Sequence, residues 1–251
     1  KDGEDKPDEA DFGSLEERDV YEVLYRLCKL SMKFDVVDSW VKPDEAMNLQ
    51  SKVLSLELLL AMLRQSGATF RSSPRFIACI KKHLCLSLLK NGVSSAPRVF
   101  NASIQVFITL ILNFKMHLKH EIGVFFTTIF LKILESPNST FQQKLMVVQL
   151  LQKICQDSQT ILDVYVNYDC DLNHTDIFAK VLNQLAKIVQ SGSGMALAAD
   201  QELQMRSKGT DALTAMVESI LEFTKRNQKD VVWSESGQVI PANMAVVNTG
   251  G

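Results

Sequence analysis

Apolar side chains recur at intervals of three and four residues through most of the 251-residue chain. This spacing places them on one face of an α-helix. Short turns rich in Pro, Gly, Ser and Asn separate the apolar segments. The pattern predicts nine helices: Ser14 to about Met32, Asp44–Gln65, Ser73–Lys90, Pro97–Leu118, Glu121–Leu134, Ser139–Cys155, Thr160–Val166, Thr175 to about Ile188, and Ala199–Asn227.

Residue types at the ends of these segments support the boundaries. Ser14 with Glu17, and Ser139 with Gln142, have the spacing of a capping box. Pro74 opens the third helix, as prolines commonly do at a first helical position. The predicted apolar faces are Val20, Val23, Leu24, Leu27 and Leu30 in the first helix; Leu49, Val53, Leu56, Leu60 and Leu63 in the second; and Leu213, Met216, Val217, Ile220 and Leu221 in the ninth.

The fourth and fifth helices are apolar on nearly every side, so neighbouring helices must cover them all round. No segment shows convincing strand alternation. The pattern therefore predicts an all-α fold, an armadillo- or HEAT-like right-handed superhelix of stacked antiparallel helix pairs, with a compact bundle as the alternative. The predicted parts are a disordered acidic lead-in (1–13), a helical solenoid (14–190), a flexible spacer (191–198), a C-terminal helix (199–230) and a tail (231–251).

One stretch, Asp163 to Phe178, breaks the helical pattern. Its Asn, Asp and Thr side chains compete with the helical backbone, which predicts that one helix ends near Tyr165 or Val166 and the next starts near Asn173 or Thr175. We expect Asn167, Asp169 and Asp171 to fix this corner, with Tyr168 and Cys170 packed beneath it. The apolar residues expected to clamp the corner onto its neighbours are Val164, Val166, Tyr168, Leu172, Ile177 and Phe178.

The corner fails as a metal site. Asp169, Asp171 and Asn173 match positions one, three and five of a calcium loop, but His174 replaces the glycine and Lys180 the glutamate that such a loop requires. Cys170 and His174 lack two further zinc ligands. His83 is expected in the core or at the edge of a groove, and His117 and His120 on a solvated surface with Lys115 and Lys119. The chain contains no phosphate-binding loop or nucleophile motif, so we predict no cofactor and no catalysis.

Net charge, cysteine spacing and the length of the apolar stretches exclude further classes of function. A net charge of −2 argues against nucleic-acid binding, and the basic residues Arg71, Arg75, Lys81, Lys82 and Lys90 are expected on an ordinary solvated face. The five cysteines show no CxxC spacing, which fits reduced, mostly buried thiols. The longest apolar stretches, Ile104–Phe114 and Ile122–Leu134, are too short to span a bilayer. These features predict a soluble helical interaction scaffold.

Several motifs resemble one known family. Tyr165-Val-Asn-Tyr-Asp-Cys-Asp-Leu-Asn173 resembles the box of the homology-upstream-of-the-exchange-domain (HUS) region of large Arf guanine-nucleotide exchange factors. Its residues Asn167, Tyr168, Asp169, Cys170, Asp171 and Asn173 are the candidate site. Four further segments resemble the brefeldin-A-inhibited, trans-Golgi branch: Leu27–Lys33, Ser51–Leu60, Lys90–Ser95 and Asn113–Lys115.

This resemblance implies a non-catalytic regulatory region, because exchange in the family belongs to a separate downstream domain. The implied partners are the upstream dimerisation domain of the same exchange factor and small GTPases of the Arf, Arl or Rab type. Membrane association would be indirect, and the location cytoplasmic, at trans-Golgi membranes. An unrelated armadillo-like protein-binding adaptor is the alternative.

Overall fold

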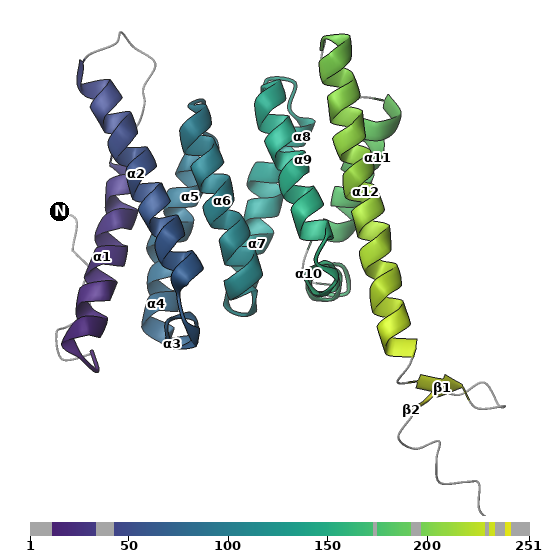
Figure 1. Cartoon of the computed structure of the whole chain (residues 1–251), viewed down its shortest axis with the longest axis horizontal. Helices are drawn as coiled ribbons and strands as arrows, with labels where there is room; N and C mark the ends of the chain where they lie inside the picture. The colour runs from purple at the N-terminus through teal and green to yellow at the C-terminus, as the bar shows by residue number, and fades with distance from the viewer. Residues whose placement is uncertain are drawn as a thin grey trace, which may run out of the picture. The chain divides into compact units, whose positions relative to one another are not determined.

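The computed structural model describes residues 12–33, 43–172, 175–191, 197–228, 231–233 and 239–241. The regular elements of this part are helices, joined by short turns, and two three-residue strands, β1 (Val231–Trp233) and β2 (Val239–Pro241), which pair in antiparallel fashion. The prediction of an all-α fold is therefore confirmed. The chain divides into two compact units, residues 1–125 and 126–251 (Figure 1).

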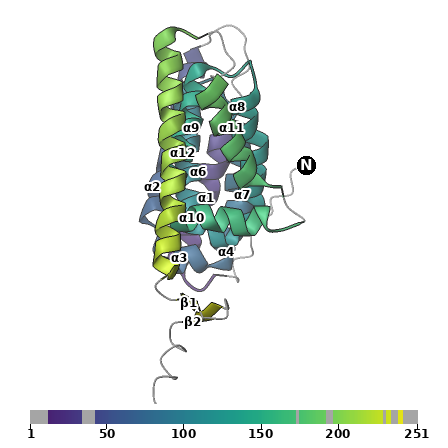
Figure 2. The same cartoon turned by 90° about the vertical axis from the view of Figure 1, so that its right-hand side faces the viewer.

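Unit 1 is built from helices that lie side by side. α2 packs between α1 and α6 (Figure 1), and α5 contacts both α1 and α6; Figure 2 gives the view turned by 90°. The bounds in this unit are α1 (Leu15–Met32), α2 (Pro43–Gln65), α3 (Ala68–Ser72), α4 (Pro74–Cys79), π-helical η2 (Ile80–Leu84), α5 (Cys85–Asn91), α6 (Pro97–Phe114), 3₁₀-helical η3 (Lys115–His117) and α7 (Lys119–Phe125). Short α3 is an addition to the predicted helices.

Unit 2 is organised around its longest helix, α12 (Ala199–Gln228), which packs against α9, α10 and α11. The other bounds are π-helical η4 (Phe126–Phe130), α8 (Leu131–Glu135), α9 (Phe141–Cys155), α10 (Ser158–Val164), π-helical η5 (Tyr165–Asp169) and α11 (Ile177–Ser191). The predicted capping box at Ser139 and Gln142 is wrong by one residue. The box joins Thr140 to Gln143, each bonded to the other's backbone N–H.

α6 forms the core of unit 1, as its apolar sequence predicts. Phe100, Phe107, Ile111 and Phe114 are all at most 2% exposed. The sequence estimate considered the apolar stretch Ile104–Phe114, whereas the whole helix α6 with η3, Pro97–His117, is by length and composition long and apolar enough to cross a membrane. However, 67% of its apolar window is buried inside the unit, as expected of a core helix.

The predicted third and fifth helices are each interrupted by a π-helical turn, η2 and η4. A π turn holds an extra residue and rotates the side chains that follow it. In η2 the turn keeps His83 and Leu84 buried. His83 lies edge-on to the ring of Tyr25, with 4.9 Å between ring centroids, which confirms its predicted place in the core.

α1 buries a different face from the one predicted. Its core residues are Tyr21, Leu24, Tyr25 and Cys28, whereas Val20 and Val23 of the predicted face are 38% and 51% exposed. The helix turns its two tyrosines inward because aromatic side chains bury more apolar area than valines. The valines are consequently left on the outer surface of α1.

α12 shows the same inversion. It buries Met205, Ala212, Ala215 and Met216, but Val217 and Leu221 are 55% and 51% exposed. Two further residues of the predicted face differ from each other: Met216 is buried, whereas Ile220 is exposed like Val217 and Leu221. Part of the inward face is small (Ala212 and Ala215) and part is large (Met205 and Met216), so the sequence pattern alone cannot reveal which side of α12 faces its neighbours.

Candidate functional site

The candidate site lies where α10 leads into α11, in unit 2. Asp157 caps the start of α10 by accepting a hydrogen bond from the backbone N–H of Gln159 at 3.3 Å. The helix does not end near Tyr165 or Val166, as predicted, but continues as η5 to Asp169. The backbone N–H of Cys170 closes this π turn by donating to the carbonyl of Tyr165 at 3.1 Å.

Asp169 holds the corner together. Its Oδ2 accepts a hydrogen bond from the backbone N–H of Phe178 at 2.8 Å, and its Oδ1 accepts one from that of Ala179 at 2.9 Å. Both donors belong to the first turn of α11, whose N–H groups have no partner within the helix. The negative carboxylate also lies at the positive end of the α11 dipole. Asp169 thus caps a helix that begins eight residues later in the sequence.

Two other side chains of the corner contribute locally. Asn167 is exposed, and its Nδ2 donates to the backbone carbonyl of Asp163 one turn earlier, at 2.8 Å. Tyr168 is 4% exposed and packs inside the unit. Tyr165 and Phe178 meet edge to face, with ring centroids 5.5 Å apart, so the two sides of the corner also touch through aromatic rings.

Several predicted roles at the corner are wrong. Cys170 is exposed, so it does not pack beneath the corner. Val166 and Leu172 do not clamp it either, being 58% and 102% exposed. Asp171 is half-buried, with its N–H bonded to the carbonyl of Tyr168 at 3.3 Å, and Asn173 lies outside the described residues. Sequence reasoning failed here because the π turn rotates residues 166 to 170 away from α-helical positions.

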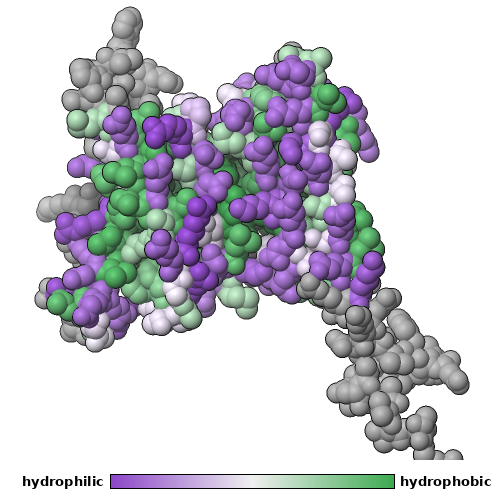
Figure 3. All heavy atoms as spheres, viewed as in Figure 1, coloured by the Kyte–Doolittle hydropathy of each residue, from purple (hydrophilic) through white to green (hydrophobic). Residues whose placement is uncertain are grey.

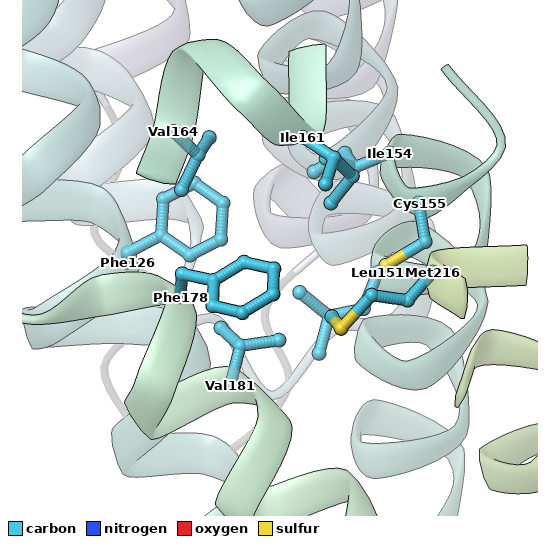
Figure 4. A pocket seen from close by; sticks show the side chains of 9 residues that line it. All are labelled: Phe126, Leu151, Ile154, Cys155, Ile161, Val164, Phe178, Val181 and Met216. Atoms are coloured by element: carbon cyan, nitrogen blue, oxygen red, sulfur yellow. The ribbon is translucent and has the colours of Figure 1, made fainter. Parts of the chain in front are cut away.

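A small cavity lies behind the corner (Figure 4). Phe178 and Val164 reach it from the corner, and Cys155 and Met216 reach it from α9 and α12. Its lining is Phe126, Leu151, Ile154, Cys155, Ile161, Val164, Phe178, Val181 and Met216. Burial raises the pKa of Cys155 to about 12, so its thiol stays protonated and is a poor nucleophile at neutral pH. The cavity therefore offers an apolar surface without reactive groups.

No metal centre forms among the described residues, where three or more His, Cys, Asp or Glu side chains nowhere converge. Asp169, the first candidate calcium ligand, already has both carboxylate oxygens bonded to α11. The thiols in unit 1 are also unsuited to nucleophilic chemistry. Burial raises the pKa of Cys79 to about 11 and that of Cys85 to about 12.

A second structural feature joins two of the segments that resemble the family. Asn91 Nδ2 donates to the carbonyl of Ser31 and to Ser87 Oγ, both at 3.1 Å. The hydroxyls of Ser31 and Ser87 lie 2.6 Å apart and share a hydrogen bond. All three residues are at most 2% exposed. This buried network ties the end of α1 to the end of α5, and sequence reasoning missed it because the partners are 60 residues apart.

The outer surface of the α1–α2 pair is unusually apolar. Val20, Val23, Leu27 and Leu30 follow one stripe of α1, and all but half-buried Leu27 are exposed. On α2, Met47, Leu54 and Leu58 are 70%, 55% and 46% exposed, at helical spacing. Green side chains gather over these two helices in Figure 3. We call these seven residues the α1–α2 outer face.

Comparison with known proteins gives the family. Residues 17–177 match the model of the Mon2/Sec7/BIG1-like HUS domain. The chain is 46% identical over 218 residues to brefeldin A-inhibited guanine nucleotide-exchange protein 1 of Homo sapiens and of Rattus norvegicus, covering 86% of this chain and 12% of each relative. It is 39% identical over 240 residues to protein 2 of that name from Arabidopsis thaliana, covering 89% of this chain and 13% of the relative.

The chain thus spans about an eighth of the length of these relatives. The matched residues include the whole corner from Asp163 to Ile177 and both ends of the Ser31–Asn91 network. From its all-helical structure and this match, the chain belongs to the Mon2/Sec7/BIG1-like HUS-domain family of brefeldin A-inhibited guanine nucleotide-exchange proteins.

Proposed function

We propose that this chain is a non-catalytic regulatory and scaffolding region of a large Arf guanine-nucleotide exchange factor. It binds the upstream domain of the same exchange factor and supports recruitment to trans-Golgi membranes by small GTPases of the Arf, Arl or Rab type. Nucleotide exchange itself belongs to a separate domain, and membrane contact is indirect. Its helix pairs extend as an armadillo- or HEAT-like right-handed superhelix.

The α1–α2 outer face carries this proposal. A stack of helices has a polar surface wherever no further element covers it. Here the outer surface of the first helix pair contains Val23, Leu54 and Leu58, each about half exposed. Full burial of a fully exposed side chain of this kind is worth about 1.5–3 kcal/mol, so covering the exposed half is worth roughly half of that. A further helical layer packed on this face would gain that energy, and we assign this role to the upstream domain.

The corner at Asp169 has a supporting role in this proposal. Both of its carboxylate oxygens bond to the backbone of α11, so it acts as a structural bracket. Its effect on partner binding is then indirect, through the geometry of α10 and α11. The family assignment also removes the alternative of an unrelated armadillo-like adaptor.

Calorimetry with the purified upstream domain tests the proposal. A chain carrying both Leu54→Glu and Leu58→Glu should lose binding and keep its melting temperature, because both side chains are exposed. Leu203→Glu is the matched control on α12, where Leu203 is 70% exposed, and should bind normally. Equal binding by all three chains would contradict the assigned face.

Two further assays test the remaining parts. GTP-loaded Arf, Arl and Rab proteins should be captured selectively by the immobilised chain, and anionic liposomes should retain the chain only when an activated GTPase is present. The chain alone should leave the rate of GDP release from Arf unchanged. Accelerated release would refute the non-catalytic assignment.

A further inference from the structure

The residues just before α1 cross the surface of unit 1 as a strap. The strap consists of Phe12, Gly13 and Ser14. The ring of Phe12 lies 5.3 Å from that of Tyr21 on α1, measured between centroids. On its other side, the guanidinium carbon of Arg75, in α4, lies 5.3 Å from the Phe12 centroid. This distance is within the range of a cation–π interaction. Phe12 thus bridges two helices, although sequence analysis placed it in a disordered lead-in.

The carboxylate of Glu17 binds both the strap and Arg75. Glu17 Oε2 accepts a hydrogen bond from the backbone N–H of Gly13 at 3.0 Å. The same oxygen lies 3.2 Å from Arg75 Nη1. The Glu17 and Arg75 side chains are 27% and 39% exposed, so water and salt reach this ion pair. The fastening is consequently sensitive to ionic strength.

The strap covers the rim of an aromatic cluster. Tyr21 and Phe76 are only 8% and 6% exposed, with ring centroids 6.4 Å apart. Phe76 stacks in turn on Phe70, at 4.2 Å. Removing the Phe12 ring would uncover the edge of this cluster beside the positive charge of Arg75. Such a surface suits an aromatic ring that lies against the Arg75 guanidinium while Arg75 stays paired with Glu17; in this chain that ring, Phe12, follows Asp11 directly and precedes Glu16 by four residues.

We propose that residues 12–14 form a releasable strap over an aromatic-binding site made by Tyr21, Phe76 and Arg75. The occupant of the site is Phe12 of the same chain. The strap opens without unfolding unit 1, because the contacts of Phe12 and Gly13 are one ring pair, one cation–π pair and one hydrogen bond, while Ser14 stays in place as the N-cap of α1. When it is open, the site accepts an acidic peptide with a central phenylalanine. This proposal is independent of the role assigned to the α1–α2 outer face.

Hydrogen exchange of the full chain tests the release of the strap. The Gly13 amide should exchange on the order of tenfold faster in Phe12→Ala, as expected when contacts of this kind are lost. Arg75→Ala should have a similar effect, and about 1 M salt should shift the unmodified chain in the same direction. The amides around Leu24 in the core of α1 should keep their protection. Arg71→Ala, whose side chain bonds to Ser66, is the matched control.

Addition of a peptide tests the binding site. A synthetic peptide of residues 8–16 should shift the amide resonances of Tyr21 and Arg75 in the Phe12→Ala chain, but not in the unmodified chain, where the site is filled. A peptide with alanine in place of phenylalanine should produce no shift. The strap is refuted if Gly13 exchanges equally fast in all variants. The binding site is refuted if the peptide shifts neither chain, or both chains alike.

Discussion

Gly209 of α12 lies so close to Val189 of α11 that a Cβ atom added to the glycine would be 3.0 Å from Val189 Cγ2. The same Cβ would be 3.3 Å from Ile188 Cγ2. Glycine inside a helix costs about 1 kcal/mol relative to alanine. Close packing of α12 on α11 offsets this cost at Gly209.

Gly209→Ala should therefore destabilise the chain despite the better helix propensity of alanine. Overpacking costs about 1–3 kcal/mol, so we expect a net loss of about 1 kcal/mol in denaturant unfolding. Adding Val189→Ala should relieve the contact and reverse the sign of the Gly209→Ala effect. Gly67→Ala, where no atom lies within 4 Å of the added Cβ, is the control. The close-packing account fails if Gly209→Ala stabilises the chain by itself.

The buried network around Asn91 predicts a second effect on stability. Asn91→Ala removes both hydrogen bonds of the side chain and leaves the Ser31 carbonyl without this donor. Leaving a buried polar group unsatisfied costs about 1–3 kcal/mol. Asn101→Ala on α6 should stay within about 0.5 kcal/mol, because Asn101 is exposed. A double-mutant cycle with Ser31→Ala should show coupling; additive effects would exclude a shared network.

Thiol accessibility gives a third prediction. Cys170 is exposed, whereas Cys28, Cys79, Cys85 and Cys155 are buried. A thiol reagent such as dithionitrobenzoate should therefore modify one cysteine of the folded chain quickly and all five after denaturation. Cys170→Ser should remove the fast phase. Fast reaction of a second thiol would contradict the packing of α1, α4, α5 or α9, which hold the four buried cysteines.

The same buried groups make stability depend on pH in alkaline solution. Burial raises the pKa of Cys85 and Cys155 from 9.0 to about 12 and that of Tyr21 from 10.0 to about 12. An unfolded chain would release these protons first, so the folded chain binds more protons above pH 9 and stability falls as pH rises. Each fully buried thiol contributes roughly 1 kcal/mol per pH unit in this window.

One buried group opposes this trend. Burial lowers the pKa of Lys144, so above its folded pKa the unfolded state binds more protons at this site and stability rises with pH. Urea titrations from pH 8 to about pH 11 should nevertheless show a net decrease, since several acidic groups act against one lysine. A free energy of unfolding that does not change over this pH range would mean that the cysteine thiols are in contact with water in the folded chain.

Local sequence signals predicted much of the fold. Helix spacing, Ser14 as a cap and Pro97 as a first helical residue gave the boundaries of α1 and α6 closely. The sequence analysis did not predict features that depend on contacts between helices far apart in the sequence. The inward turn of Tyr21 and Tyr25, the inward face of α12 and the Ser31–Asn91 network all depend on which helix lies opposite. The periodicity of one segment contains no information about its neighbour.

At the corner, composition predicted that Asp169 and its polar neighbours fix the turn. Asp169 does so by accepting two hydrogen bonds from the start of α11, the next helix, which composition alone could not specify atom by atom. Cys170 was expected inside and lies outside, because the π turn η5 shifts the residues that follow it. Irregular backbone of this kind has no simple signature in the spacing of apolar residues.

The structural role of Asp169 is the central claim at this corner. Asp169→Ala removes a carboxylate that accepts two backbone hydrogen bonds, and loss of such a cap costs about 0.5–2 kcal/mol. Asp169→Asn should fall between the alanine variant and the unmodified chain, since one amide oxygen remains as an acceptor. Asn167→Ala, in the same box but exposed, should cost less than about 0.5 kcal/mol.

The most direct measurement follows thermal unfolding of the Asp169→Ala chain together with its affinity for the upstream domain. If Asp169 acts only by holding the start of α11 in place, the Asp169→Ala chain should have a lower melting temperature. Any loss of affinity should then appear only together with this loss of stability. An unchanged melting temperature with abolished binding would show that Asp169 contacts the partner directly, and would contradict the account.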